Sequence, residues 1–161
     1  MTEEAAAAQG PSPTQAGATQ ITVAEIRAAQ NFALAVPAGL AAAIVGAGVW
    51  AAFTVVTEMQ LGLIAIAIGY VVGQAIRQVG KGIDTKFGVL GALCALFGCA
   101  LGNSLSALIF FAQAKHVSIL ALLNPDTIIR VTTLFAQPMD LVFYGIAIYE
   151  GYRFSFRYRL K

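Results

Sequence analysis

The sequence predicts an all-α membrane protein with four transmembrane helices, a short outer interfacial helix and a disordered N-terminal tail. Of its 161 residues, 58% are hydrophobic and only 11% are charged, whereas a soluble domain carries about 25% charged residues. Long uncharged runs recur along the chain, and glycine and alanine recur within them at three- and four-residue spacing. We therefore expect helices with Gly/Ala-rich packing faces.

The same composition excludes several classes of protein. A soluble enzyme would need far more polar surface, and a net charge of +2 gives no basic surface for nucleic acid. The single histidine and the absence of a C-x-x-C pair leave no zinc or haem signature. No catalytic motif is present, so we expect no catalytic residue, cofactor or metal. Cys94 and Cys99 are expected to be buried and unbridged.

Residues 1–21 are rich in Ala, Gln, Gly, Pro, Ser and Thr, and we expect them to form a disordered cytoplasmic tail. They lack the features of a cleavable signal peptide. The membrane domain then covers 22–161, and its first predicted span, 32–56, is long enough to cross about 30 Å of hydrocarbon. Pro37 is expected to kink this helix or to separate a surface helix from the span.

The second and third predicted spans are 61–79 and 87–112. A short connection at 57–60 precedes the second span. A polar, glycine-rich loop, Gly80-Lys-Gly-Ile-Asp-Thr-Lys86, separates the two spans. Its Lys81-Gly-Ile-Asp84 portion could contact phosphate headgroups, although a lone lysine flanked by glycines is a weak signal.

Within the segment 113–137, residues 117–135 are fairly apolar, but Asn124-Pro125-Asp126 divides them and Arg130 follows this tripeptide. Asn124 as N-cap and Pro125 at the first helical position predict the start of a short helix. We interpret this segment as an interfacial or re-entrant element on the outer side. The last predicted span covers 138–156 and is dense in aromatic residues.

The distribution of basic residues predicts the orientation. Four spans with an inside N-terminus leave only Lys115 and Arg130 on the outer side. The inner side then holds eight bases: Arg27, Arg77, Lys81, Lys86, Arg153, Arg157, Arg159 and Lys161. We therefore expect a multi-pass membrane protein with both termini in the cytoplasm.

Small residues form two ladders at helical spacing. The helix-packing candidates are Gly62, Gly69 and Gly73 in the second span and Gly91, Gly98 and Gly102 in the third. Such ladders let helix backbones approach closely in lipid. Two interpretations remain open: the ladders pack helices within one chain, or one ladder faces a second subunit.

Four stretches carry a resemblance to a known group of proteins. They are Gly80-Lys-Gly-Ile-Asp, Phe87-Gly-Val-Leu-Gly-Ala, Gly98-Cys-Ala-Leu-Gly-Asn103 and Asp140-Leu-Val-Phe-Tyr-Gly-Ile-Ala-Ile-Tyr-Glu-Gly-Tyr-Arg-Phe-Ser155. With them, roughly residues 30–156 resemble a group of uncharacterised bacterial four-span inner-membrane proteins. The resemblance implies a bacterial inner membrane and adds no activity.

Five polar residues in or near the spans are candidates for function. Glu150 lies in the last span, where an ionisable group is costly; an ion pair with Arg153 three residues later is the alternative explanation. Asp140 is expected to complement its helix dipole. Asn103 and Gln74 are expected to form interhelical hydrogen bonds or to line a polar path.

Two functions fit these features. The first is a non-catalytic oligomeric or accessory (scaffold) subunit of a membrane assembly, which contacts the lipid bilayer and either a second copy or another membrane protein. The second is a small oligomeric channel or transporter for an ion or small solute, lined by Gln74, Asn103, Asp140 and Glu150. A protein of four spans without internal repeats is small for alternating access.

The basic-residue asymmetry predicts which positions are accessible from the outer side. A membrane-impermeant thiol reagent added outside should modify Lys115→Cys and Glu58→Cys, and should leave Leu160→Cys unmodified. Modification of Leu160→Cys from outside in intact cells would contradict the four-span arrangement.

Overall fold

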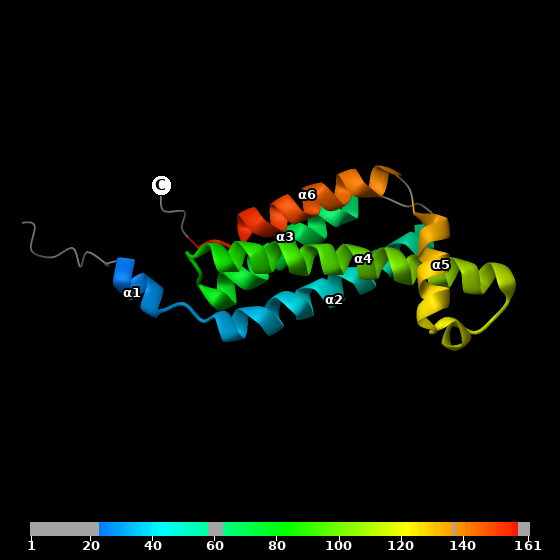
Figure 1. Cartoon of the computed structure of the whole chain (residues 1–161), viewed down its shortest axis with the longest axis horizontal. Helices are drawn as coiled ribbons and strands as arrows, with labels where there is room; N and C mark the ends of the chain where they lie inside the picture. The colour runs from blue at the N-terminus through cyan, green and yellow to red at the C-terminus, as the bar shows by residue number, and fades with distance from the viewer. Residues whose placement is uncertain (1–22, 58–62, 137, 158–161) are drawn as a thin grey trace, which may run out of the picture.

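The computed structural model describes residues 23–57, 63–136 and 138–157, and this part of the chain is helical without any strand (Figure 1). The predicted tail, 1–21, and Gly62 lie outside the described residues. The elements are α1 (Val23–Ala28), α2 (Phe32–Thr57), α3 (Leu63–Gly80), α4 (Thr85–Lys115), the 3-10 helix η2 (Ile119–Leu122), α5 (Pro125–Phe135) and α6 (Pro138–Phe154).

Three of these helices, α2, α3 and α4, are long and apolar enough to cross a membrane. α5 and α6 meet this criterion only as a pair, and their axes differ by 103°. The joint between them passes residue 137, which lies outside the described residues. The sequence prediction of membrane helices is therefore confirmed for three segments, and the fourth predicted span coincides with α6.

Local sequence signals explain where the helices begin. The Asn31 side-chain oxygen accepts a hydrogen bond from the Leu34 N–H at 3.0 Å and so caps α2. The break between surface helix and long helix therefore falls at residues 29–31, and Pro37 lies inside α2. The prediction for α5 is confirmed, because the Asn124 side chain accepts from the Asp126 N–H at 3.0 Å and Pro125 opens the helix.

α3 and α4 form the centre of the bundle, and α2 and α6 each pack against both of them. α2 runs parallel to α4, since Ala43 lies opposite Gly98 and Trp50 lies opposite Gly102. α3 runs parallel to α6 in the same way. Half of the most apolar stretch of α4 is buried, against 22% for α2. α4 is thus the central helix and α2 a peripheral one.

α4 is longer than a bilayer requires. Its 31 residues span about 46 Å, whereas the hydrocarbon core is about 30 Å thick. The C-terminal part of α4 continues past the bundle, where α5 crosses it (Figure 1). A second small core forms at this crossing from Ala107, Leu108, Ala112, Leu122 and Val131.

The glycines of α3 contact α6. A Cβ atom at Gly69 would lie 2.5 Å from the Ala147 carbonyl oxygen, and one at Gly73 would lie 2.7 Å from the Phe154 Cβ. Both distances are too short for any side chain. Glycine is therefore required for the two backbones to pack at this separation.

The glycines of α4 contact different neighbours. Gly91 touches the backbone of Gly151 in α6, Gly102 faces α2, and Gly98 meets both Ala43 of α2 and Ile68 of α3. A Cβ atom at Gly102 would meet Trp50 at 3.2 Å. The ladder glycines in the described part of the chain thus make close contacts within one chain.

The outer surface of the helices is apolar. Exposed large apolar side chains occur on all four long helices, as expected for contact with lipid tails. They include Leu34, Leu40, Ile44, Val45, Val49, Phe53 and Val56 of α2, Leu63 and Val71 of α3, Val89 and Leu93 of α4, and Leu141 and Val142 of α6.

The glycine contacts predict a contrast between two pairs of variants. Gly69→Ala and Gly91→Ala place a methyl group against a neighbouring backbone, and we expect each to lower the free energy of unfolding by about 1–3 kcal/mol. At Gly48 and Gly145, an added methyl group would meet no atom within 4 Å. Gly48→Ala and Gly145→Ala should therefore stabilise their helices, by up to about 1 kcal/mol.

Unfolding of the four variants in mixed micelles, with the oligomeric state recorded in parallel, measures this contrast. Equal stability of Gly69→Ala and Gly145→Ala would contradict the packing described. A change in oligomeric state without loss of stability in Gly69→Ala would instead favour a subunit interface at this ladder.

Candidate functional site

The loop between α3 and α4, residues 81–84, is bound by segments from both ends of the described chain. The Asn31 N–H donates to the Gly80 carbonyl at 2.9 Å, just before the loop. The Arg157 N–H donates to the Gly82 carbonyl at 2.8 Å. These two backbone bonds hold the start of α2, the loop and the segment after α6 together at one end of the bundle.

Aromatic packing fixes the conformation of this loop. Lys81 adopts a left-handed backbone with φ of 49°. The Phe87 ring lies so close to Gly82 that no side chain fits there, and it also packs edge-on against Phe32 with the ring centroids 5.4 Å apart. The Lys86 ammonium lies 5.7 Å from the Phe32 centroid and 5.6 Å from that of Phe87, a cation–π geometry.

Gln30 connects the segment after α1 to the loop through three hydrogen bonds. Its amide nitrogen donates to the Asp84 carboxylate at 3.1 Å, and its carbonyl oxygen accepts from the N–H groups of Ile83 and Asp84 at 3.1 and 3.4 Å. Asp84 also pairs with Arg27 at 3.5 Å and with Lys86 at 3.6 Å. The negative charge of Asp84 is therefore balanced locally.

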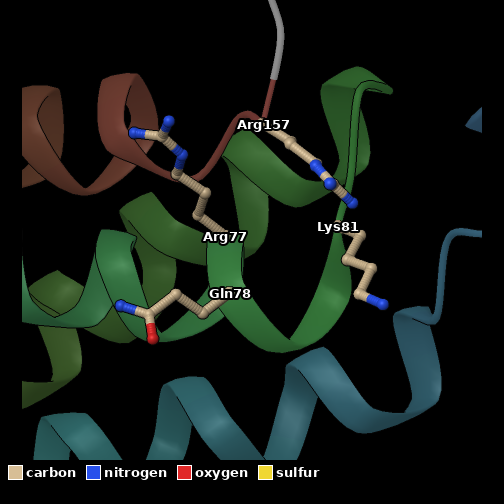
Figure 2. Close-up of a pocket in the computed structure, with 4 residues that line it drawn as sticks. All are labelled: Arg77, Gln78, Lys81 and Arg157. Atoms are coloured by element: carbon tan, nitrogen blue, oxygen red, sulfur yellow. The ribbon is translucent and has the colours of Figure 1, made fainter.

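An open cavity of about 310 Å³ lies at the same end of the bundle and is lined by Arg77, Gln78, Lys81 and Arg157. Arg77 and Gln78 come from the last turns of α3, Lys81 follows that helix directly, and Arg157 lies just after α6. In Figure 2 the Arg157 side chain extends toward the Lys81 backbone, and the Arg77 guanidinium lies beside the end of α6. Three basic side chains and one amide, without a carboxylate, thus line this cavity.

The polar candidates within the spans occupy separate places. Asn103 is 4% exposed, and its side chain is hydrogen-bonded to Tyr144 of α6. The Tyr144 hydroxyl also approaches the Cys99 carbonyl at 3.5 Å. Asp140 lies one turn earlier, in the first turn of α6, where a carboxylate complements the helix dipole. Asn103 therefore links α4 to α6, one of the two roles expected for it.

Glu150 and Arg153 do not pair with each other in the part of the chain that is described. The Arg153 guanidinium carbon lies 5.9 Å from the ring centroids of both Tyr149 and Phe154. Its Nη1 atom donates to the Tyr149 hydroxyl at 3.5 Å. Arg153 is exposed and Glu150 half-buried, so the arginine packs over the aromatic rings on the outer surface of α6. The expected ion pair is thus replaced by cation–π contacts.

Gln74 bonds within its own helix rather than across to another. Its side-chain nitrogen donates to the Tyr70 hydroxyl at 3.0 Å, and the Tyr70 ring packs edge-on against Phe154 at 5.0 Å. Gln74 does not meet the pair of Asn103 and Tyr144 in any contact between described residues. The candidate polar set therefore does not form one cluster.

Two buried polar atoms of α2 have no hydrogen-bond partner in the structure, the Trp50 Nε1 and the Thr54 Oγ1. Trp50 lies against Gly102 of α4, and the Ser106 hydroxyl donates to the Gly102 carbonyl at 2.9 Å. Sequence reasoning did not single out these residues. Cys94 and Cys99 are buried and unbridged, which confirms that prediction.

The basic cavity and the Gln30 contacts were also missed from the sequence. Arg77 counted only as a marker of orientation, and Lys81 was considered for headgroup contact only together with Gly82, Ile83 and Asp84. Arg157 lies 76 positions beyond Lys81 in the chain, and no local pattern relates the two. Gln30 carries no signal that distinguishes it from other polar residues near a helix start.

Comparisons of this chain with protein-family models, with curated proteins and with solved structures found no match. Arguments about function therefore depend on the contacts, charges and burial described above.

The Gln30 contacts predict a local effect on the loop. Gln30→Ala removes the three hydrogen bonds to the loop, and we expect it to destabilise the attachment of the segment after α1 by on the order of 1 kcal/mol. Hydrogen exchange at the Ile83 and Asp84 amides should become correspondingly faster. Gln113→Ala, at an exposed position near the other end of α4, is the matched control, and equal exchange in the two variants would contradict the role of Gln30.

Proposed function

We propose that this chain is a four-span protein of the bacterial inner membrane with both termini in the cytoplasm. The strongest support for the fourth span is the register of α6 against α3. Gly69 contacts Ala147 and Gly73 contacts Phe154, so the two helices run in parallel side by side. Because α3 is itself a candidate span, α6 occupies the same depth.

The arrangement of charges supports the orientation. The basic residues near the ends of α1, α3 and α6 and at the start of α4 gather at one end of the bundle: Arg27, Arg77, Lys81, Lys86, Arg153 and Arg157. Lys115 and Arg130 lie at the opposite end, on α4 and α5. By the positive-inside rule the first end is cytoplasmic.

α5 is the proposed interfacial helix on the outer side. It buries Val131, with Ile128 and Phe135 packed alongside, against the end of α4. Arg130 and Ile129 on its other faces are exposed. A short amphipathic helix that crosses the end of a long span suits the headgroup region, and this favours the interfacial over the re-entrant interpretation.

The proposed role is that of a non-catalytic accessory or scaffold subunit of a membrane assembly. The observation that carries this proposal is that close helix packing fills the interior of the bundle. Gly69, Gly91 and Gly151 each lie in contact with the backbone of a neighbouring helix. The organised polar groups lie instead at the basic end, around Asp84 and the cavity. Contact with other molecules would therefore use the outer surfaces of the bundle and this end.

A channel or transporter has weaker support. It requires Gln74, Asn103, Asp140 and Glu150 to line one path. Asn103 bonds to Tyr144 between α4 and α6, whereas Gln74 bonds to Tyr70 on its own helix. Asp140 and Glu150 lie near opposite ends of α6. The four side chains therefore face different surroundings.

Photo-crosslinking in native membranes tests the accessory role. A crosslinking residue placed at Val45, Val71 or Val142, which are exposed on three different helices, should capture one partner at fixed stoichiometry, either a second copy or another membrane protein. Ala43, which is fully buried, is the matched control and should capture nothing. Absence of any protein adduct at all three exposed positions would contradict an assembly role.

A flux assay in liposomes tests the alternative. We expect vesicles containing the inserted protein to conduct no more than empty vesicles. Flux that is present in the wild type and lost in Glu150→Gln would replace the accessory role with the channel, because that substitution removes the charge and keeps the shape.

A further inference from the structure

We propose that the cavity between Arg77, Lys81 and Arg157 is a binding site for a phosphate-bearing anion, and that the headgroup of an anionic phospholipid is its occupant in the membrane. Sequence alone offered only the Lys81-Gly-Ile-Asp84 stretch. The structure adds two guanidinium groups from separate segments and a concave surface between them.

The chemistry of the lining matches a phosphate group. Guanidinium groups bind phosphate oxygens through paired hydrogen bonds, and an ammonium group adds a point charge and three donors. Gln78 contributes an amide that donates to an oxygen without adding charge. The four lining residues include no carboxylate to repel an anion.

The carboxylate of the same loop is engaged outside the cavity. Asp84 pairs with Arg27 and Lys86 at 3.5 and 3.6 Å and accepts from the Gln30 amide. These contacts lie on the side of α1 and α4. Arg77 and Lys81 thus contribute two positive charges to the lining of the cavity.

The backbone around the cavity is held in place. The bond from the Arg157 N–H to the Gly82 carbonyl, at 2.8 Å, ties one wall to the loop. Lys81 is held in a left-handed conformation that a lysine adopts at some cost. In Figure 2 the Arg77 and Lys81 side chains point in different directions, so their rotamers must change for both to contact one anion.

Size and surroundings favour a lipid headgroup over a larger soluble ligand. A volume of about 310 Å³ lies at the lower end of ligand pockets, which hold about 300–1,000 Å³. The exposed surface of α3 next to the cavity is apolar and aromatic, with Tyr70, Val71 and Val79. A phospholipid whose headgroup binds in the cavity would therefore lay its acyl chains along this apolar surface. A free phosphate ion has no acyl chains and would not make this contact.

Titration of the purified protein with lipid, followed by native mass spectrometry, tests the proposal. The probes are phosphatidylglycerol, phosphatidylcholine and inorganic phosphate. The wild type should retain phosphatidylglycerol in preference to phosphatidylcholine. Each basic residue near a membrane surface contributes about fivefold in affinity, so Arg77→Gln combined with Lys81→Gln should weaken phosphatidylglycerol binding roughly thirtyfold.

Lys115→Gln combined with Arg130→Gln is the matched control, because it removes the same charge at the other end of the bundle. This control should bind phosphatidylglycerol like the wild type. Equal binding of phosphatidylglycerol by the two double variants would overturn the proposal. It would also be overturned if the wild type retained phosphatidylglycerol and phosphatidylcholine equally and did not bind inorganic phosphate.

Inorganic phosphate distinguishes the two sources of the anion. Phosphate binding that is lost in the Arg77 and Lys81 double variant, without any preference between the two lipids, would support the anion site with a soluble phosphate compound as occupant. Arg77→Lys with Arg157→Lys keeps the charge and removes the paired hydrogen bonds. It should bind phosphatidylglycerol more weakly than the wild type, and unchanged binding in this folded variant would overturn recognition by the guanidinium groups.

Discussion

The close approach of α6 to the central pair of helices is the constraint on which the rest of the structure depends. Within lipid, helices gain little from burying apolar surface, so contact must come from van der Waals packing at short range. Gly91 and Gly151 allow the backbones of α4 and α6 to lie in contact. Gly69 of α3 allows the same close contact with the backbone of Ala147 in α6. This docking sets where α6 ends, and it thereby places Arg157 next to the α3–α4 loop.

The basic end of the bundle is organised by that placement. The loop after α3 receives the Arg157 backbone on one side and the Gln30 amide on the other. Asp84 forms ion pairs with Arg27 and Lys86. These two basic residues are therefore held apart from the basic residues that line the cavity. One short loop thus separates the ion-paired residues around Asp84 from the basic residues that line the cavity.

The helices and their boundaries could be predicted from the sequence because apolar runs and caps are local signals. Asn124 with Pro125 marked α5, and the three- and four-residue spacing of small side chains marked the packing faces. The partner of each face was not predictable: Gly91 meets α6 but Gly98 on the same ladder meets α2. The spacing of Glu150 and Arg153 likewise allowed a pair, yet Tyr149 and Phe154 compete for the same guanidinium. Such choices depend on contacts between distant segments, which local patterns do not encode.

The parallel pairing of α2 with α4 has a consequence for how the protein is made. A protein chain is synthesised from its N-terminus. α2 is therefore made before α3, and its parallel neighbour α4 is made only after α3. The faces of α3 and α4 at Gly69 and Gly91, which pack against α6, stay exposed to lipid until α6 has been synthesised. An unfinished or stalled chain therefore displays a groove of exposed backbone that the completed protein hides.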